Sequence, residues 1–590
     1  MFMLDNPLVT IVLPVYNGEN YVKCALDSLL SQSYTYFEVL VIDDGSIDTD
    51  YLPNLISTLN DSRIIYHRKN NGGVSSAINH AIREMKGQYL AWLSHDDLFS
   101  ENKLEIQITH MLEAKSDDLI LFSGYDLIDD KGRHLSSVDF SKEILLCQRL
   151  GGLERGLING CTIFISKSTL DEVGQFNESL RYTQDYDYWL RCLKVGKNFE
   201  YVPQPLVKTR IHSGQDSIAH LQSAKLEAEI LWLEISKYWF SKATMELSLN
   251  VRETLFFRDF LCKNGFSLAE EFINQSLLNL IREIKVSVVI PYFNRPFLIQ
   301  TALRSLEGQT HQNLEVVIVD DNSYGEGIRI SQIENFSFPI KLIRNENNTG
   351  AGQSRNLGLE ICTGDFICFL DSDDIFLPEK VFEQVIQMLA TDSEISHTNY
   401  FSRDNVLGAF NFHDTSRHVG FDQVSYILKN GCTIATPTVM IKRSLIEKVK
   451  SPFPQTKKAG EDIAGWITLL HNSINSMLHI QMPLTVVRLH TNSAAKNKHA
   501  QEESKEVTAE LLLQLDIPDL QKIETIDSKR KKLYAQSNLV LIEFKKKSLQ
   551  KLLGVFWFMY RNFPQSLRKS LGRLPIVKQV YRKVRIAAGF

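Results

Sequence analysis

The stretch Phe366-Ile367-Cys368-Phe369-Leu370, followed directly by Asp371-Ser372-Asp373-Asp374, decides how the rest of the chain is interpreted. A short apolar run of this kind predicts a buried strand, with the carboxylates at its carboxyl end. Open α/β sheets place their ligand sites at that end of the strands. Carboxylates this close repel one another unless a cation lies among them, and oxygen ligands favour Mg²⁺ or Mn²⁺. The simpler alternative is an Asp-rich turn that caps the next helix.

The same arrangement occurs earlier in the chain, at Tyr89-Leu90-Ala91-Trp92-Leu93-Ser94-His95-Asp96-Asp97. Ser94 aligns with Asp371 at an offset of 277 residues, and the same offset pairs Pro14 with Pro291, Asp43 with Asp320, Asn70 with Asn347, Asn79 with Asn356 and Asp185 with Asp462. Two matches have slightly different offsets: Asn159-Gly160-Cys161-Thr162 with Asn430-Gly431-Cys432-Thr433, and His212 with His490. A period this long indicates a duplicated domain.

Composition places the chain among ordinary globular proteins. Its 590 residues are 44% hydrophobic and 23% charged, and the net charge of −5 does not favour a nucleic-acid partner. The eight cysteines show no CxxC spacing, so we expect a reducing compartment without a zinc site or disulfide framework. We find no transmembrane run and no secretory signal pattern, and therefore expect a cytoplasmic protein.

Strands and helices alternate in the same order in both copies. The expected elements of the first copy are a strand at 9–15, a helix at 21–30 and a strand at 37–42, and those of the second copy are 286–290, 298–306 and 314–319. The strands are continuous apolar runs, which is typical of a parallel sheet buried on both faces. This alternation predicts an α/β protein with two tandem α/β/α domains.

The copies set the expected domain boundaries: 1–217 and 285–497, with a helical connector at 218–284 and a helical region at 498–590. Apolar residues at helical intervals predict that the connector is packed rather than flexible. Residues 545–590 contain twelve Lys or Arg and no Asp or Glu, interleaved with aromatic residues. Such a segment suits the surface of an anionic membrane; a basic helix packed on the acidic remainder, or a docking segment for another protein, are the alternatives.

Four polar motifs recur in the same order in each copy. They are an aspartate pair that ends the second strand (Asp43-Asp44; Asp320-Asp321), an Asn- and Gly-rich turn that opens a helix (70–73; 347–350), the acidic strand end (Asp96-Asp97; Asp371, Asp373 and Asp374), and a later pair before an aromatic helix (Gln184-Asp185; Glu461-Asp462). Glycine motifs for dinucleotides or for nucleoside triphosphates are not matched, so dehydrogenase and kinase functions are disfavoured.

This order of motifs, beginning with Pro-x-Tyr/Phe-Asn, resembles the inverting glycosyltransferases of family 2, which have the GT-A fold. The resemblance covers about residues 8–215 and 285–495, and the second copy matches more closely. It implies two tandem GT-A domains that transfer sugars from nucleotide-diphosphate sugars, with UDP-sugars as the expected donors. The tandem arrangement also resembles polymerases that add two sugars in alternation to a capsule or lipopolysaccharide chain. This resemblance implies a glycan or lipid-linked glycan acceptor at the cytoplasmic face of the inner membrane.

The resemblance also implies residue roles. Nucleotide-sugar contacts fall on Asp43, Asp44, Asp320, Asp321, Asp371 and Arg355; metal ligands on Asp96, Asp373, His212 and His490; and the catalytic base on Asp185 and Asp462. A bound Mn²⁺ or Mg²⁺ would offset the charge that develops on the leaving diphosphate. The base would take the proton of an acceptor hydroxyl, and attack opposite the leaving group would invert the anomeric centre.

The first copy departs from the second at three positions: Ser94 replaces Asp371, Ile78 replaces Arg355 and Gln184 replaces Glu461. We expect the first copy to be active, with a different sugar or a weaker affinity for metal. One alternative is that only the second copy transfers sugar and the first binds the acceptor. Another is a nucleotidyltransferase, which would release pyrophosphate and leave the late carboxylate without a task.

Overall fold

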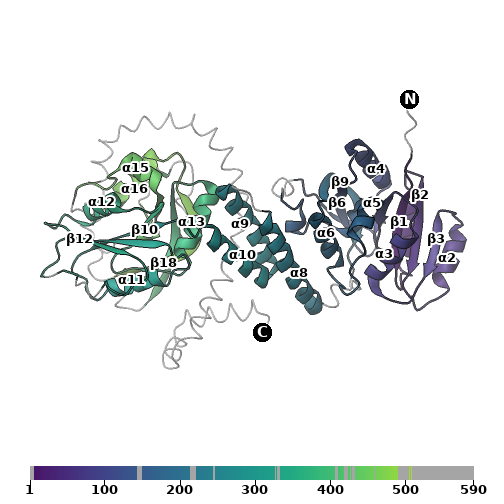
Figure 1. The fold of residues 1–590 in the computed structure, drawn as a ribbon, viewed down its shortest axis with the longest axis horizontal. Coiled ribbons are helices and arrows are strands. Elements are labelled where there is room, and N and C mark those ends of the chain that lie inside the picture. Colours follow the sequence, from purple (N-terminus) through teal and green to yellow (C-terminus); the bar gives the residue numbers. More distant parts are fainter. Residues whose placement is uncertain are drawn as a thin grey trace, which may run out of the picture. The chain divides into compact units, whose positions relative to one another are not determined.

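The structure of the chain, a computed structural model, describes residues 6–141, 149–212, 221–242, 246–325, 327–328, 333–404, 409–416, 423–424, 427, 432–456, 459–489, 504 and 507. The chain forms two compact units, each with its own sheet (Figure 1). Unit 1 consists of Met1–Thr244 and Phe257–Gln275, and unit 2 of Met245–Phe256 and Ser276–Phe590. Each unit contains one copy of the sequence repeat.

The first repeat forms a mixed sheet with flanking helices. Its elements are β1 (Val9–Val15), α1 (Val22–Leu30), β2 (Phe37–Asp43), α2 (Tyr51–Leu59), β3 (Ile64–Arg68), α3 (Gly73–Glu84), β4 (Tyr89–Trp92), β5 (Leu98–Phe99), α4 (Lys103–Ala114), β6 (Leu119–Ile128), β7 (His134–Val138), η2 (Leu153–Arg155), η3 (Gly160–Thr162), β8 (Phe164–Ser166), α5 (Lys167–Val173), α6 (Gln184–Lys194) and β9 (Asn198–Arg210). The strand order is β3-β2-β1-β4-β8-β6-β9-β5, with β7 paired to β6.

The second repeat forms the same sheet from corresponding elements. They are β10 (Val286–Tyr292), α11 (Ile299–Glu307), β11 (Leu314–Asp320), β12 (Ile340–Arg344), α12 (Ala351–Ile361), β13 (Phe366–Phe369), β14 (Ile375–Phe376), α13 (Lys380–Thr391), β15 (Ile395–Asp404), β16 (Phe410–His413), η6 (Thr436–Thr438), β17 (Met440–Lys442), α15 (Arg443–Val449), α16 (Glu461–Asn472) and β18 (Leu478–Leu489). The order β12-β11-β10-β13-β17-β15-β18-β14 repeats that of unit 1 position by position. The predicted tandem α/β architecture is confirmed.

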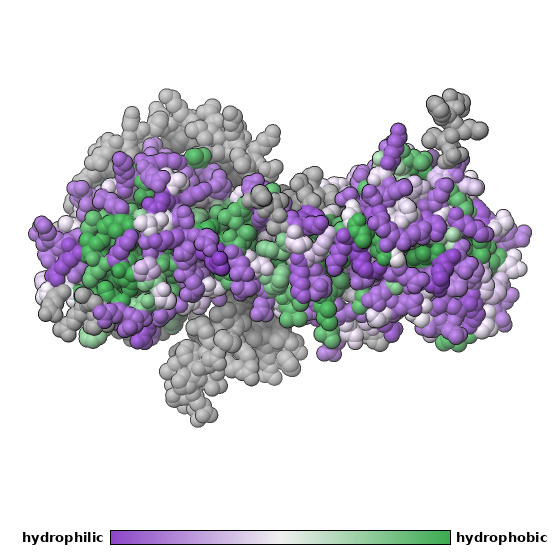
Figure 2. All heavy atoms as spheres, viewed as in Figure 1, coloured by the Kyte–Doolittle hydropathy of each residue, from purple (hydrophilic) through white to green (hydrophobic). Residues whose placement is uncertain are grey.

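The central strands are buried on both faces. Every residue of β1, β2 and β11 is buried, as their continuous apolar runs predict for parallel strands. In unit 2, α12, α15 and α16 lie on one side of the sheet and α11 lies on the other (Figure 1). Figure 2 shows hydrophilic residues over much of the visible surface, with apolar residues among them. The carboxyl ends of the parallel strands are the edge at which α/β sheets bind ligands.

Three helices occupy the region between the repeats: α8 (Leu221–Ser241), α9 (Leu247–Asn264) and α10 (Ser267–Leu280). Helix α8 belongs to unit 1, where the ring of Trp232 lies 5.8 Å from that of Tyr186 in α6. Within the described part of the chain, none of the helices combines the length and apolar character needed to cross a bilayer. The basic segment 545–590 lies outside the described residues.

The structure corrects one alignment of the repeat. In unit 1, Gln107 Nε2 donates to the carbonyl of Thr162 in η3 (2.9 Å). The same bond in unit 2 runs from Gln384 Nε2 to the carbonyl of Thr438 in η6 (3.0 Å). The match of the first Asn-Gly-Cys-Thr sequence with 430–433 is therefore wrong. The turn is positioned by the strand that follows it, which pairs with β4 or β13, and not by the short sequence identity.

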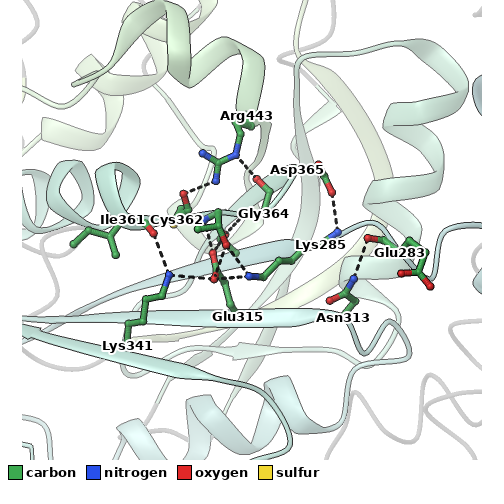
Figure 3. Close-up of polar contacts among 12 residues, drawn as sticks. Glu283, Lys285, Asn313, Glu315, Lys341, Ile361, Cys362, Gly364, Asp365 and Arg443 are labelled. Carbon is green, nitrogen blue, oxygen red and sulfur yellow. Dashed lines mark hydrogen bonds and ion pairs between the residues drawn. The ribbon is translucent and has the colours of Figure 1, made fainter.

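A polar network braces the amino-terminal edge of the sheet in unit 2 (Figure 3). Glu315 of β11 accepts hydrogen bonds from Lys285 Nζ (2.8 Å), the Ser287 hydroxyl (2.6 Å) and the Thr363 hydroxyl (2.8 Å), and Lys341 Nζ lies 3.4 Å away. Burial opposes ionisation of this carboxyl, but these donors lower the pKa of Glu315 to about 2. The brace therefore lies at the opposite ends of the strands from the predicted site.

Candidate active site

The predicted aspartates leave each sheet at the carboxyl edge of its parallel strands. Asp320 is the last residue of β11, and Asp371 and Asp373 follow the end of β13. Because β10 pairs in parallel with both of these strands, their carboxyl ends share one edge. In unit 1, β1 pairs in the same way with β2 and β4, which brings Asp43 and Asp96 to the corresponding edge.

Asp43 is buried and strongly hydrogen-bonded. Its carboxylate accepts bonds from the Tyr66 hydroxyl (2.8 Å), the Arg68 guanidinium (2.6 Å) and the backbone N–H of Ser46 (2.8 Å). Burial opposes ionisation, but the hydrogen bonds and the charge of Arg68 hold the pKa of Asp43 below its ordinary value. The carboxylate is therefore ionised and fixed in direction.

The equivalent aspartate of unit 2 has a different neighbour. Leu342 of β12 occupies the register position that Tyr66 has in β3. Asp320 accepts a hydrogen bond from the backbone N–H of Ser323 (2.9 Å), and Arg344 donates to the carbonyl of the same serine (2.6 Å). The strand-end carboxylate of unit 1 thus accepts a hydrogen bond from a phenol, and the corresponding residue of unit 2, a leucine, cannot donate one.

Asp44 and Asp321 hold the loop that opens the next helix. Asp44 accepts the backbone N–H groups of Gly72 (3.0 Å) and of the residue after it (2.7 Å) at the start of α3. Asp321 accepts those of Thr349 (2.8 Å) and of the residue after it (2.7 Å) at the start of α12. Both oxygens of each carboxylate are therefore engaged with their own loop, and a nucleotide contact for these two residues stays a prediction.

Arg355 joins two predicted parts of the site in unit 2. Its side chain is only 4% exposed and donates to Asp371 (3.0 Å) and to Glu461 (3.0 Å). Burial opposes its charge, but Asp371, Glu461 and Asp462 raise the pKa of the Arg355 guanidinium. The residue expected to contact a diphosphate is thus engaged with carboxylates of its own chain, and it links the acidic strand end to the start of α16.

Asp462 is a partly buried carboxyl at the second position of α16. Burial and then the negative charge of Glu461 raise the pKa of Asp462 to about 6, against the opposing charge of Arg355. The Thr436 hydroxyl of η6 donates to its Oδ2 at 3.4 Å. A carboxylate with a pKa near neutrality is suited to accept a proton from a hydroxyl group.

The predicted metal ligand of unit 2 has a cationic partner. Asp373 forms an ion pair with Arg295 (2.5 Å), which lies in the turn after β10, where unit 1 has Gly18. The neighbouring Asp374 accepts the backbone N–H of Arg488 (2.8 Å). Burial and the nearby carboxylates raise the pKa of Asp374 well above its ordinary value.

In unit 1, the structure brings two predicted metal ligands together. His212 Nε2 lies 3.0 Å from Asp96 Oδ2. Asp97 accepts the backbone N–H of Arg210 (2.8 Å), and burial followed by the charge of Asp96 raises the pKa of Asp97 to about 7. The fourth predicted ligand, His490, lies outside the described residues.

Asp185 occupies the same position in α6 that Asp462 has in α16. Burial is the main cause that raises the pKa of Asp185 to about 6, and the negative charge of Glu227 adds to the increase. The backbone N–H of Tyr186 donates to its Oδ1 (2.9 Å) and partly offsets the increase. Both units therefore hold one carboxyl of similar pKa at the start of the equivalent helix.

The three departures of unit 1 affect one network of contacts. Arg355 contacts both Asp371 and Glu461 in unit 2, and unit 1 has Ile78, Ser94 and Gln184 at their places. All three positions are uncharged in unit 1, so none of them leaves a buried charge without a partner. Ser94 instead contacts the sulfur of Cys161 through its amide and hydroxyl groups (both 3.3 Å).

Three side chains at the site were not predicted from the sequence: Arg295, Thr436 and Glu227. The sequence held a signal for Arg295, because this residue directly follows Asn294, and the first copy also has an asparagine at that place. Thr436 was missed because its segment was aligned with the wrong turn. Glu227 lies in a helix beyond the repeat and carries no local sequence signal.

Asp96 and His212 are the predicted metal ligands that the structure brings together. Within the described ranges, no group of three or more His, Cys, Asp or Glu side chains could hold a metal ion. Asp96 and His212 offer the oxygen and nitrogen donors that suit Mn²⁺, whereas Asp373 is paired with Arg295. Mg²⁺ and similar ions are commonly bound by one or two carboxylates and completed by water and substrate phosphates, so the residues of unit 1 fit such an ion.

Comparisons with known proteins identify the family. The family model described as glycosyl transferase family 2 matches residues 10–173 and 287–450. An uncharacterised glycosyltransferase of Rickettsia felis is 35% identical over 497 residues, which cover 82% of this chain and 79% of that protein. The Escherichia coli UDP-Glc:alpha-D-GlcNAc-diphosphoundecaprenol beta-1,3-glucosyltransferase WfgD is 30% identical over 217 residues, which cover 36% of this chain and 80% of that protein.

Among solved structures, S. aureus TarS 1-349 in complex with UDP-GlcNAc matches with a TM-score of 0.36 and 20% identity, over 46% of this chain and 80% of that one. A likeness this low carries no argument about function. The two family matches cover more than half of the chain, and each lies in a unit with the expected sheet and acidic strand end. The chain therefore belongs to glycosyl transferase family 2, as a glycosyltransferase with two tandem GT-A domains.

Proposed function

We propose that the chain is a bifunctional inverting glycosyltransferase that extends a bacterial surface polysaccharide, such as a capsule or lipopolysaccharide chain. The observation that carries this proposal is the Arg355 bridge, which joins the acidic strand end to the helix that begins with Glu461 and Asp462. It supports one pocket in which a donor diphosphate and an acceptor hydroxyl meet. Unit 1 retains the acidic strand end and the equivalent Asp185, which supports a second active pocket.

The donors in this proposal are UDP-sugars. Asp43 and Asp320, at the ends of β2 and β11, would accept hydrogen bonds from the nucleotide. The name of the E. coli relative specifies UDP-Glc as its donor, which supports the same donor class here. Because Tyr66 faces Asp43 while Leu342 takes its place in unit 2, the two pockets would bind their nucleotides with different contacts.

Charge neutralisation and proton removal are the chemical tasks of each site. Mn²⁺ or Mg²⁺, held by Asp96 and His212 in unit 1 or by Asp373 in unit 2, would supply positive charge at the leaving diphosphate. Asp185 or Asp462 would accept the proton of the attacking hydroxyl group. With a pKa of about 6, either carboxyl is mostly ionised at neutral pH and still basic enough for this transfer. Displacement on the face opposite the diphosphate inverts the anomeric centre.

The acceptor in this proposal is a glycan or lipid-linked glycan at the cytoplasmic face of the inner membrane. The relative WfgD acts, by its name, on a diphosphoundecaprenol-linked sugar. The twelve basic residues of 545–590, together with their aromatic neighbours, would favour peripheral contact with anionic lipid.

Incubation of the full chain with an acceptor and pairs of UDP-sugars tests the proposal. Asp185→Asn and Asp462→Asn should each reduce incorporation of one sugar by about 100-fold or more, the scale of a lost general base, while UDP is the nucleotide product. If Asp185→Asn leaves both sugars incorporated, unit 1 is an acceptor-binding module. Release of pyrophosphate in place of a nucleoside diphosphate would instead identify a nucleotidyltransferase.

A further inference from the structure

A carboxylate from the linker helix α8 holds the loop that leads into α6. Glu227 Oε1 accepts the backbone N–H groups of Tyr182 (2.8 Å) and Thr183 (2.7 Å) and the Thr183 hydroxyl (2.7 Å), and Oε2 accepts the backbone N–H of Arg181 (3.1 Å). One ionised group thus accepts the backbone N–H groups of three consecutive residues and one side-chain hydroxyl, all directly before α6. Hydrogen bonds to an ionised acceptor are about twice as strong as neutral ones.

These contacts end two residues from Asp185. Thr183 is the N-cap residue of α6, and its own side chain makes no capping bond to the helix because its hydroxyl is directed to Glu227. The first turn of α6 therefore takes its position from α8. A negative group near the amino terminus of a helix is also stabilised by the helix dipole.

Unit 2 holds the equivalent helix in a different way. Gly460 precedes α16 with a φ of 98°, and a side chain at that position would collide with Ser504, a residue beyond the second repeat. Ser504 stands 277 residues after Glu227, at the repeat offset, and is a neutral residue. The start of α16 is instead tied to the acidic strand end through Glu461 and Arg355.

We propose that Glu227 is a positioning residue of the first transferase site, which fixes the start of α6 and thereby the direction of the Asp185 carboxylate. It performs in unit 1 the task that the bridge from Arg355 to Glu461 performs in unit 2. The assignment rests on the proposed role of Asp185 as a base. It makes the linker helix a working part of the first site, although α8 lies outside the family match.

Electrostatics adds a measurable signature. Burial opposes ionisation of Glu227, but its hydrogen bonds lower the pKa of Glu227, so it carries its charge at neutral pH. The pKa of Asp185 is raised by burial, lowered by the backbone N–H groups of Tyr186 and of Asp185 itself, and raised by the charge of Glu227. The nearby Asp187 is already paired with Arg191 (3.0 Å) on the same helix. Removal of the Glu227 charge should therefore lower the pKa of Asp185.

The test uses the full chain with the second site disabled by Asp462→Asn, and measures UDP release and sugar incorporation by the first site against pH. Glu227→Gln should lower kcat by about 10- to 100-fold, the scale of a misplaced catalytic group, with KM for the donor changed much less. The ascending limb of its pH profile should move to lower pH. Thr183→Val, which removes only the hydroxyl contact, gives a milder variant and should lower kcat by about fivefold, as expected for one hydrogen bond.

Glu234→Gln is the matched control, because Glu234 lies on α8 but pairs at the surface with Lys237 (2.6 Å). It should leave kcat and the pH profile unchanged. The inference is overturned if Glu227→Gln and Thr183→Val both leave kcat and the ascending limb unchanged while Asp185→Asn abolishes turnover. If Asp185→Asn itself leaves first-site turnover intact, Asp185 is not the base, and the positioning role of Glu227 is overturned with it. This result differs from the previous one, in which only the positioning role fails.

Discussion

Arg355 is nearly buried and balances two carboxylates at 3.0 Å, so the three side chains act as one unit. Removal of the arginine alone leaves Asp371 and Glu461 close together without a counter-charge, whereas removal of all three leaves nothing to balance. Unit 1 has the second arrangement, with an aliphatic residue, a serine and an amide. The effects of single substitutions in this network should therefore not add.

Arg355→Ile should destabilise unit 2 by up to about 3 kcal/mol, the scale for breaking a buried ion pair. Because Arg355 lowers the pKa of Asp462, its loss should raise that pKa and move the ascending limb of second-site activity to higher pH. The triple variant Arg355→Ile, Asp371→Ser, Glu461→Gln should recover part of the stability. Urea unfolding and a pH–rate profile in the Asp185→Asn background measure both effects.

Arg304→Gln, at an exposed position of α11, serves as the control and should change neither quantity. If the triple variant is destabilised by the sum of its three single substitutions, the residues do not form one network.

At the scale of an element, β11 has a carboxylate near each end, and the two have different neighbours. Its last residue, Asp320, lies at the carboxyl edge of the parallel strands, while Glu315 near its start is enclosed by Lys285, Ser287 and Thr363. The hydrogen bonds of Glu315 therefore hold the end of the strand that is remote from the proposed nucleotide contact. A substitution at Glu315 should affect stability and leave that proposed contact in place.

Glu315→Gln should lower the free energy of unfolding of unit 2 by about 1–3 kcal/mol, because buried donors lose an ionised acceptor. The pKa of Glu315 is lowered to about 2 in the folded chain, against an ordinary value of 4.5. Its contribution to stability is therefore present above about pH 4.5 and is lost as the pH falls toward 2. Chemical unfolding at a series of pH values should show this loss in the parent chain and not in the variant.

The exposed Glu307, at the end of α11, provides a comparison on a neighbouring element. Glu307→Gln should retain the pH dependence of the parent. An unchanged pH dependence in Glu315→Gln would show that the brace contributes nothing to stability.

At the scale of the whole molecule, the two copies of the fold share an aspartate at the second position of the equivalent helix but differ in the neighbours of the acidic strand end. Asp96 lies beside His212 in unit 1, while Asp373 lies beside Arg295 in unit 2. A divalent cation would have to displace Arg295 from Asp373 in unit 2. In unit 1, the partner of Asp96 is His212, which can itself bind a metal ion. The two sites should therefore differ in their demand for metal.

Removal of divalent ions with EDTA should abolish transfer at both sites, and the second site should need more Mn²⁺ to recover. Arg295→Gly, which introduces the residue of unit 1, should lower the half-saturating Mn²⁺ concentration of the second site about threefold, the scale of a partly exposed ion pair. Activity titrations with one site disabled at a time, together with equilibrium dialysis of Mn²⁺, measure the half-saturating Mn²⁺ concentration of each site. Equal requirements in the two sites, unaffected by Arg295→Gly, would contradict the prediction.

The sequence predicted the duplicated sheet because buried parallel strands leave continuous apolar runs, such as 9–15, that need no information from elsewhere in the chain. It also predicted that acidic strand ends would meet at one edge. It did not reveal the contact of Arg355 with Glu461, because these residues are far apart in the chain. The contacts of Glu227 were likewise hidden, because its partners are mainly backbone N–H groups, which nearly every residue type supplies.

The coordinated replacement of Arg355, Asp371 and Glu461 has an electrostatic consequence for substrate choice. Two anions and one cation in unit 2 correspond to three uncharged side chains in unit 1, so this part of the first pocket carries one negative charge fewer. Arg295, which unit 1 replaces with Gly18, adds one positive charge beside Asp373 in unit 2 and offsets this difference. We therefore expect an anionic sugar to meet its charged neighbours at different places in the two units, and not a different total charge.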